Sequence, residues 1–241
     1  MCESTFDEEM ASVGAGIGGG FDHSSELKVL NYKQAMASNE KAEWMKEIEQ
    51  EHERMLKYNV WDLVHMKDVP EATPLTSTWA FKKKSTGKRR GRLNAHGFKQ
   101  KPSVHCKKGS VSSPVTNEVT IRIVLVIILL LQLLAGVLDV KGAFLQGNFD
   151  DDEEPIFMEI PDGLKDKYDE DTVLKLLAPI YGLRNASMAF YKKLKKCMNM
   201  IGCKRSLADP CLYFAWASGL MIWLSWIDDC LYCGKPKDVA Y

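Results

Sequence analysis

Two adjacent aspartates, Asp228 and Asp229, interrupt an otherwise apolar run from Leu224 to Tyr232. Apolar segments on both sides of a short polar interruption favour two strands joined by a tight turn. Burying an unpaired carboxylate costs several kcal/mol, and a like charge beside it adds to that cost. Such a pair is therefore expected mainly where a cation compensates the charge, and it indicates a metal site.

A third aspartate lies far upstream in a similar setting. Asp139 interrupts the strand-like apolar run from Gly136 to Phe144. Three carboxylates on two strands can hold two divalent cations about 3.5–4 Å apart, the arrangement that many phosphoryl-transfer enzymes use. The alternative is that each aspartate caps a turn and that the two segments never meet. Spacing alone leaves both interpretations open.

The segment from Ile121 to Leu138 is the most apolar part of the chain. A membrane span needs about 20 apolar residues, but this run is interrupted by Gln132 and Gly136 and leads directly into Asp139. A buried helix ending near Leu130, followed by a core strand from about Leu133 to Val140, explains the same residues. We favour this interpretation over a membrane anchor.

Overall charge does not indicate a nucleic-acid-binding protein, because 32 Lys and Arg balance 32 Asp and Glu. Local charge is more informative. Residues 78–84 and 89–95 predict a β-hairpin in which Lys82 shares a face with Lys84, and Arg90 with Arg92. This basic patch suits a triphosphate or a nucleic-acid backbone. A solvated basic hairpin without a ligand is the alternative.

The remaining patterns predict the other elements. Residues 38–58 predict an amphipathic helix with Ser38 or Asn39 as N-cap and a solvated acidic face. Further predicted elements are strands at 61–64, 173–180 and 211–216, and a helix that begins at Tyr181 and runs to about Met200. The acidic run 150–154 is predicted to be a solvated turn.

Seven cysteines without a framework spacing favour a reducing compartment, with thiols at Cys230 and Cys233 rather than a zinc site.

Three blocks of the sequence resemble successive motifs of one family. Residues 139–147, 181–184 and 226–229 resemble the reverse transcriptase of copia-type LTR retrotransposons. Lesser blocks follow the same order, at residues 59–64, 92–100, 113–115 and 208–210. The resemblance covers roughly residues 32–234, and the order and spacing of the blocks carry it.

The resemblance implies an α+β fold with reverse-transcriptase-like fingers and palm, in which an antiparallel palm sheet packs on helices. After a Gly-rich tail (1–30), which its composition predicts to be disordered, the resemblance implies a fingers-like region (31–115) and a palm-like region (116–241) that stops before the thumb and ribonuclease H regions. The implied function is RNA-directed DNA polymerase, with transfer of a nucleotide from a dNTP to a primer 3′-hydroxyl by a two-metal mechanism.

The resemblance also assigns residues to the site. It implies catalytic roles for Asp139, Asp228 and Asp229, and metal binding by Asp139, Val140 and Asp228. Two Mg²⁺ ions are expected, with Mn²⁺ as the alternative. Gly142 and Ala143 would offer backbone N–H groups to phosphate. The full set of implied nucleotide-binding residues is Lys82, Arg90, Arg92, Gly142, Ala143, Phe144, Tyr181, Gly182 and Arg184. Phe144 would lie under the sugar, which implies a preference for deoxynucleotides.

Some positions depart from the family pattern. Residues 185–190 lack the family's Pro and Arg, Trp226 replaces Tyr, and Gly142 replaces Asn. Because the Pro and the Arg are missing and the thumb and ribonuclease H regions are not included, we expect weak or no activity from this chain alone. The expected partners are an RNA or DNA template with primer, dNTP, and a second copy or other polyprotein domains, with no membrane. The expected location is the cytoplasm, within a virus-like particle in an intact element, or else the nucleus.

The rival interpretations are a non-catalytic nucleic-acid-binding remnant and a protein anchored in a membrane through residues 123–138.

Overall fold

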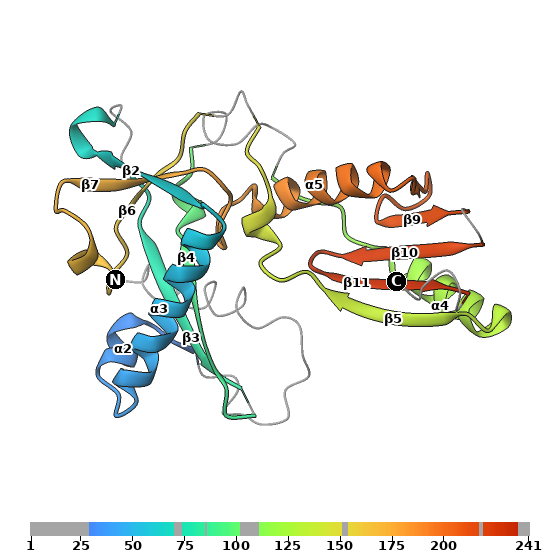
Figure 1. The fold of residues 1–241 in the computed structure, drawn as a ribbon, viewed down its shortest axis with the longest axis horizontal. Helices are drawn as coiled ribbons and strands as arrows, with labels where there is room; N and C mark the ends of the chain where they lie inside the picture. The colour runs from blue at the N-terminus through green and yellow to red at the C-terminus, as the bar shows by residue number, and fades with distance from the viewer. Residues whose placement is uncertain are drawn as a thin grey trace, which may run out of the picture. The chain divides into compact units, whose positions relative to one another are not determined.

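The computed structural model describes residues 29–69, 74–84, 86–101, 111–150, 154–216 and 219–235. Helices and three antiparallel sheets make up this part of the chain, which confirms the predicted α+β class (Figure 1). The predicted tail up to residue 28 and residues 151–153 of the acidic run lie outside the described residues. The chain divides into two compact units, unit 1 (1–108 and 149–186) and unit 2 (109–148 and 187–241).

Unit 1 contains two three-stranded sheets. The first has the order β1-β3-β4, with β1 at Val29–Leu30, β3 at Ser77–Lys83 and β4 at Arg89–Ala95. The second has the order β2-β7-β6, with β2 at Trp61–His65, β6 at Phe157–Glu159 and β7 at Thr172–Leu176. The predicted hairpin is thus present as β3 and β4, and the predicted strand 173–180 ends earlier, at Leu176.

Two helices accompany these sheets, α2 (Tyr32–Met36) and α3 (Lys41–Lys57). The apolar stripe of α3 is buried, and its Trp44 ring lies 5.5 Å from the ring of Phe81 on β3. The predicted caps Ser38 and Asn39 are wrong. The N-cap of α3 is Glu40, whose side chain makes no capping hydrogen bond and instead forms ion pairs with Lys83 and Arg89.

Unit 2 is built on one five-stranded antiparallel sheet with the order β5-β11-β10-β9-β8 (Figure 1). Its strands are β5 (Leu134–Asp139), β8 (Lys204–Arg205), β9 (Leu212–Ala215), β10 (Met221–Trp226) and β11 (Asp229–Gly234). Its helices are α4 (Glu118–Leu131) and α5 (Ala186–Met200). The short 3-10 helices of the described chain are η2 (Met66–Asp68), η3 (Gly97–Lys99), η4 (Phe144–Gln146) and η5 (Lys165–Lys167).

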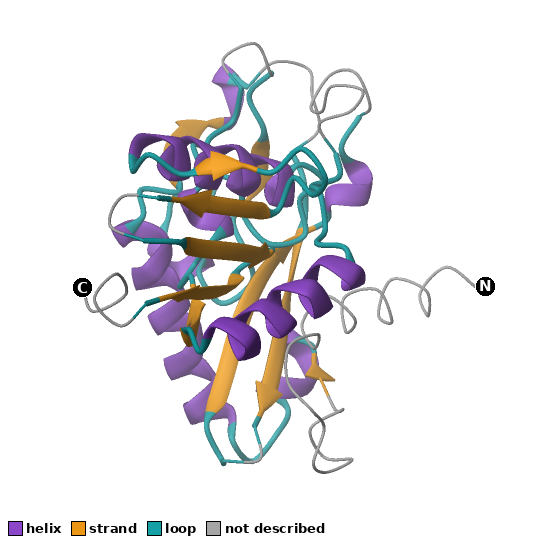
Figure 2. Ribbon diagram, turned by 90° about the vertical axis from the view of Figure 1, so that its right-hand side faces the viewer, coloured by secondary structure: helices purple, strands orange, loops and turns teal. Residues whose placement is uncertain are grey.

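The two helices of unit 2 cover opposite faces of this sheet, as the alternation along its strands requires. Val124 of α4 packs with Ile222 of β10 and with Cys233 of β11. Met198 of α5 packs with Tyr213 of β9 and with Trp223 of β10. Trp223 follows Ile222 directly, so the two side chains lie on opposite faces of the sheet. Figure 2 shows the strands of this sheet with helices on both sides. The sheet is therefore the middle layer of unit 2.

The predicted burial of residues 121–138 is wrong, although the predicted helix and strand are present. Most large side chains of α4 and β5 are exposed, and Leu129 and Leu130 each keep 76% of their surface accessible. The α4 side chains that reach the core are Val124, Ile127 and Ile128, which is one narrow helical stripe. The other apolar side chains of α4 lie on its outer side. Among the described residues, no helix is long and apolar enough to cross a membrane.

Candidate active site

The two adjacent aspartates lie at a tight hairpin turn in unit 2. The β10–β11 register pairs Trp226 with Asp229, which leaves Ile227 and Asp228 in the turn. Ile227 has a φ of 55°, a conformation that is rare for a β-branched residue. The Ile227 side chain lines a pocket together with Pro114 and Phe190. Packing in this pocket accounts for how the strained backbone is held.

The third aspartate joins them from β5. Asp139 lies directly opposite Asp229 in the register of β5 with β11. Just beyond the strand, the N–H of Val140 donates to the carbonyl oxygen of Asp228, with N and O 2.9 Å apart. Directly opposed residues in an antiparallel pair have Cβ atoms about 4.5–5.5 Å apart. The structure therefore brings Asp139 to the same end of the sheet as Asp228 and Asp229, which lie some ninety positions later in the sequence.

The electrostatics of this carboxylate cluster follow from its position. Partial burial raises the pKa of Asp229, and the nearby charges of Asp228 and Asp139 raise it further. Asp139 and Asp229 are exposed and Asp228 is half-buried. The expectation of buried carboxylates is therefore wrong, because the turn lies at the surface, where water screens part of the repulsion.

The donors of the carboxylate cluster suit a hard divalent cation. Carboxylate and carbonyl oxygens are the ligands that Mg²⁺ prefers, and Asp139, Asp228 and Asp229 offer only such oxygens. Within the ranges that the structure describes, no three His, Cys, Asp or Glu side chains are placed so that they could hold a metal ion. The chemistry of the donors thus fits the expected ion, and their side-chain arrangement is not that of an assembled site.

The segment after Asp139 forms a compact turn. Gly142 adopts a φ of 64°, a left-handed conformation that glycine adopts without steric cost. The N–H of Ala143 donates to the carbonyl of Val140, with N and O 3.1 Å apart. The Ala143 amide is therefore engaged within the turn, unlike the expected phosphate contact. Phe144 is half-buried at the start of η4.

Unit 1 carries the expected basic residues on its hairpin. The β3–β4 register pairs Lys82 with Arg90, so that their side chains share one face. Arg92, two residues along the same strand, places its guanidinium carbon 4.6 Å from the ring centroid of Tyr181. This cation–π geometry orients the guanidinium plane. The structure thus brings together three of the candidate nucleotide-binding residues, Arg90, Arg92 and Tyr181.

A buried carboxylate, which sequence reasoning missed, faces these arginines. Glu51 of α3 is 1% exposed, and its Oε2 lies 2.5 Å from Nη1 of Arg54. Burial raises the pKa of Glu51, opposed by the charges of Arg54, Arg92 and Arg90. Burial, together with the charge of Arg92, lowers the pKa of Arg90. The sequence analysis assigned Glu51 to a solvated acidic face. The available signal was its spacing, because Glu51 lies on the same side of α3 as the buried residues Ile48, His52 and Met55.

The turn 181–184 is attached to the end of β4 and does not begin a helix as expected. The structure starts α5 at Ala186 instead. Gly182 has a φ of 87°, and a Cβ there would lie 2.2 Å from the carbonyl oxygen of Ala95. The N–H of Arg184 donates to Oε1 of Gln100, with the two atoms 2.7 Å apart. Gln100 is 2% exposed, and sequence reasoning gave it no role.

A second buried carboxylate is Asp209, which is 2% exposed and binds backbone amides in unit 2. One of its oxygens accepts from the N–H of Asn117 and the other from the N–H of Cys211, both at 2.9 Å. The hydroxyl of Thr116 donates to the carbonyl of Ser225 on β10. These bonds attach the start of α4 to the strands that lead into the aspartate turn. The sequence block 208–210 was noted only as part of a resemblance.

Comparison with known proteins places the chain in a family. Residues 58–240 match the family described as "Reverse transcriptase (RNA-dependent DNA polymerase)". The chain is 34% identical over 222 residues to the "Retrovirus-related Pol polyprotein from transposon TNT 1-94" of Nicotiana tabacum, an alignment that covers 89% of this chain and 16% of that protein.

Two proteins of Arabidopsis thaliana are similar at 31% identity. They are the "Retrovirus-related Pol polyprotein from transposon RE2", with 80% of this chain and 13% of that protein aligned, and the corresponding polyprotein from transposon RE1, with 76% and 12%. The chain therefore spans less than a fifth of the length of these relatives. Since the family match covers most of the chain, the chain belongs to the reverse transcriptase (RNA-dependent DNA polymerase) family and is related to the Pol polyproteins of transposons.

Proposed function

We propose that this chain is the fingers and palm part of a copia-type reverse transcriptase, and that its carboxylate cluster catalyses nucleotidyl transfer. The observation that carries the proposal is the register of β5 with β11, which puts Asp139 opposite Asp229 and beside Asp228. Carboxylates brought together from separate segments, in a chain of this family, are what two-metal phosphoryl transfer requires.

In the proposed mechanism Asp139 and Asp228, with the backbone of Val140, would hold two Mg²⁺ ions, and Asp229 would add negative charge at the edge of the site. Bound Mg²⁺ supplies stabilisation of the attacking and leaving oxygens. Burial is the larger cause of the raised pKa of Asp229, and the negative charges of Asp228 and Asp139 add to it. Gly142 and Phe144 position the dNTP, with Phe144 disfavouring a ribose 2′-hydroxyl.

In unit 1 we assign phosphate binding to Lys82, Arg90 and Arg92, and a supporting role to the turn that contains Tyr181, Gly182 and Arg184. The shared face of Lys82 and Arg90 supports this assignment, because paired cations match a polyphosphate. Template and primer are held by backbone charge and shape, since a copying enzyme must accept any sequence. The cytoplasm, within a virus-like particle, is the proposed location.

Primer extension tests the proposal. The chain is incubated with an RNA template, a labelled DNA primer and dNTPs, with Mg²⁺ or with EDTA. We expect weak Mg²⁺-dependent extension, which Asp228→Asn lowers ~10²–10³-fold, the scale on which loss of one group that stabilises transition-state charge acts. Asp62→Asn, at an exposed position of β2 in unit 1, is the matched control and should extend normally.

Two outcomes would contradict the proposal. One is extension that Asp228→Asn leaves unchanged, and the other is extension that persists in EDTA. Template binding without any extension by the wild-type chain would instead favour the non-catalytic nucleic-acid-binding remnant.

A further inference from the structure

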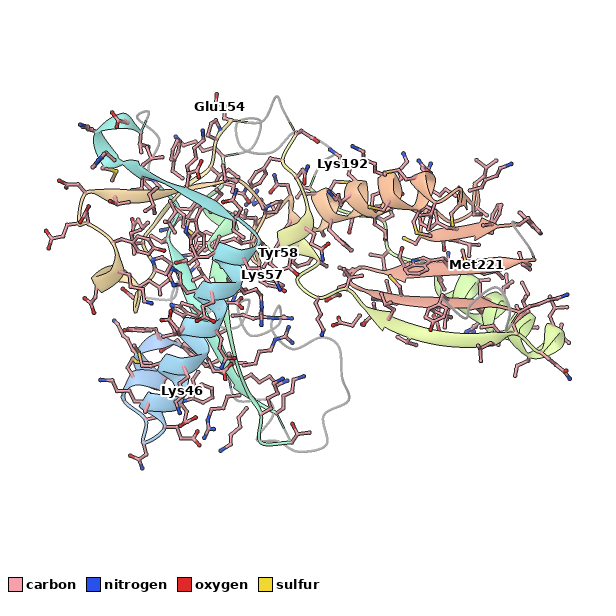
Figure 3. All side chains as sticks on the ribbon, in the orientation of Figure 1. Lys46, Lys57, Tyr58, Glu154, Lys192 and Met221 are labelled. Carbon is pink, nitrogen blue, oxygen red and sulfur yellow. The ribbon has the colours of Figure 1, made fainter. Side chains whose placement is uncertain are left out.

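The outer side of α5 carries a row of lysines that the proposed catalytic site does not use. Lys192, Lys195 and Lys196 line a surface hollow together with Asn199 and Met200. Residues three and four positions apart lie on the same side of a helix, so the three lysines and Asn199 form one stripe. We call this stripe the lysine face. Figure 3 labels Lys192 on α5, on the side away from β9.

The lysine face is opposite to the side of α5 that packs in the core. Leu194 and Met198 face Tyr213 and Trp223 of the sheet. Lys192 and Lys196 are exposed, and Lys195 is half-exposed. The lysines therefore lie outside the core that α5 forms with the sheet, and their side chains are accessible from solvent.

The stretch of sequence that contains α5 carries charges of one sign only. Residues 172–208 contain no Asp or Glu, whereas Lys192, Lys193, Lys195, Lys196, Lys204 and Arg205 fall within fourteen positions of that stretch. The whole chain has a formal net charge of zero. Cations are thus concentrated on this part of unit 2 and compensated elsewhere in the chain.

A comparison with α3 argues against an ordinary solvated helix face. The outer side of α3 carries charges of both signs, and there Lys46 pairs with Glu43, with Nζ and Oε1 3.0 Å apart. In the part of the chain that the structure describes, neither Lys195 nor Lys196 has an ion-pair partner. Like charges at i, i+3 and i, i+4 repel one another along a helix. An external polyanion would relieve this repulsion.

The basic surface continues from α5 onto β8. Arg205 donates from Nη1 to the hydroxyl of Tyr191, with the two atoms 3.0 Å apart, which fixes this arginine against α5. The lysine face itself extends about 10 Å from Lys192 to Asn199, at 1.5 Å per residue. Phosphates along one strand of a duplex are spaced at about 3.4 Å of axial rise. The lysine face therefore matches the backbone of about three nucleotides.

We propose that the lysine face of α5 binds the phosphate backbone of the nucleic acid that this chain handles, at a position separate from the carboxylate cluster. The choice of nucleic acid as the polyanion rests on the proposed function. The contacts are electrostatic and independent of sequence, because lysine donates to phosphate as a point charge. The lysine face would thereby add affinity for a strand without taking part in chemistry.

The salt dependence of RNA binding tests this inference. The whole chain is titrated against a labelled single-stranded RNA of mixed sequence, without dNTP or Mg²⁺, at several salt concentrations. The triple variant Lys192→Gln, Lys195→Gln, Lys196→Gln keeps good helix-forming residues. We expect the slope of log K against log [salt] to fall in magnitude by ~2, and the affinity at low salt to fall ~10–100-fold.

Two matched variants serve as controls. Lys33→Gln, Lys57→Gln, Lys67→Gln removes three exposed lysines from unit 1 and should leave the slope unchanged. Lys192→Arg, Lys195→Arg, Lys196→Arg keeps the charge and should keep the wild-type slope. An unchanged slope in the α5 glutamine variant, or an equal loss in the unit 1 variant, would overturn the inference. Because the assay needs no catalysis, failed primer extension leaves this result intact, and a failed binding effect leaves the catalytic proposal intact.

Discussion

Asp209 shows how a single buried carboxylate can organise the surroundings of the carboxylate cluster. Burial opposes ionisation of Asp209, but hydrogen bonds from the hydroxyl of Thr120 and from the amides of Cys211 and Asn117 outweigh burial and hold its pKa below the usual value. A carboxylate that accepts several such bonds is stabilised in its charged form. The charged side chain thus ties α4 to β9.

We expect Asp209→Asn to lower the free energy of unfolding by about 1–3 kcal/mol near pH 7, because one buried amide loses its acceptor. Since the pKa of Asp209 is lower in the folded state, its contribution is present above the unfolded pKa of about 4 and is lost as the pH falls through the lower, folded value. The difference between wild type and variant should therefore stay constant from about pH 7 to about pH 5 and shrink as the pH falls below about 4. Urea unfolding at several pH values measures this, and a difference that does not shrink below about pH 4 would argue against the assigned role.

At the same scale, the sequence predicted some site residues and missed others for identifiable reasons. Asp139 and the pair 228–229 could be predicted because each interrupts an apolar strand, and a strand brings its terminal residues to the end of a sheet. Glu51 and Gln100 could not be predicted, because their burial depends on which distant segments pack over them. The positive φ of Gly182 was likewise not visible, so the turn 181–184 was assigned to a helix.

At the scale of single elements, the apolar pattern of α4 and β5 predicted their type and their ends but not which side of each is buried. The change from helix to strand was predicted near the observed ends of both elements. A helix that is apolar on all sides gives no signal about which side is buried. The neighbours decide this: β5 lies at the edge of its sheet with β11 as its strand partner, and α4 packs through one stripe. Most apolar side chains of α4 and β5 are therefore exposed, although their sequence predicted burial.

The end of α4 offers a test of its local geometry. Gln132 has a φ of 52° and a ψ of 45°, and its N–H donates to the carbonyls of Ile128 and Leu129. Glycine is the residue usually found in this left-handed position, because other residues incur a steric cost there. We expect Gln132→Gly to raise the free energy of unfolding by about 0.5–1 kcal/mol. Thermal or urea unfolding measures it, with Gln132→Ala as a control that should show no gain, and a less stable glycine variant would contradict the assigned geometry.

At the scale of the whole molecule, neither unit is a continuous stretch of chain. Unit 1 needs residues 149–186 in addition to residues 1–108, and unit 2 takes the segments between and after them. The sheet β2-β7-β6 depends on both segments of unit 1, because its central strand β7 comes from residues 149–186 and β2 from residues 1–108. A cut between residues 115 and 116, the boundary that the resemblance implies between fingers-like and palm-like regions, would separate β2 from β7. The functional division itself stays a prediction.

This arrangement predicts how fragments behave. A fragment of residues 1–115 keeps β2 but loses all five of its register partners on β7, from Leu176 to Thr172, so that Trp61 loses the strand against which it is buried. We expect this fragment to unfold without a cooperative transition in urea. A second protein, in which a Gly/Ser linker of equal length replaces residues 109–148 and the chain ends at residue 186, retains every strand of both unit 1 sheets. Because its apolar core is intact, it should unfold cooperatively. If the 1–115 fragment instead unfolded with the same midpoint and slope as the linked protein, residues 149–186 would contribute nothing to the stability of unit 1, and the discontinuous unit would have to be abandoned.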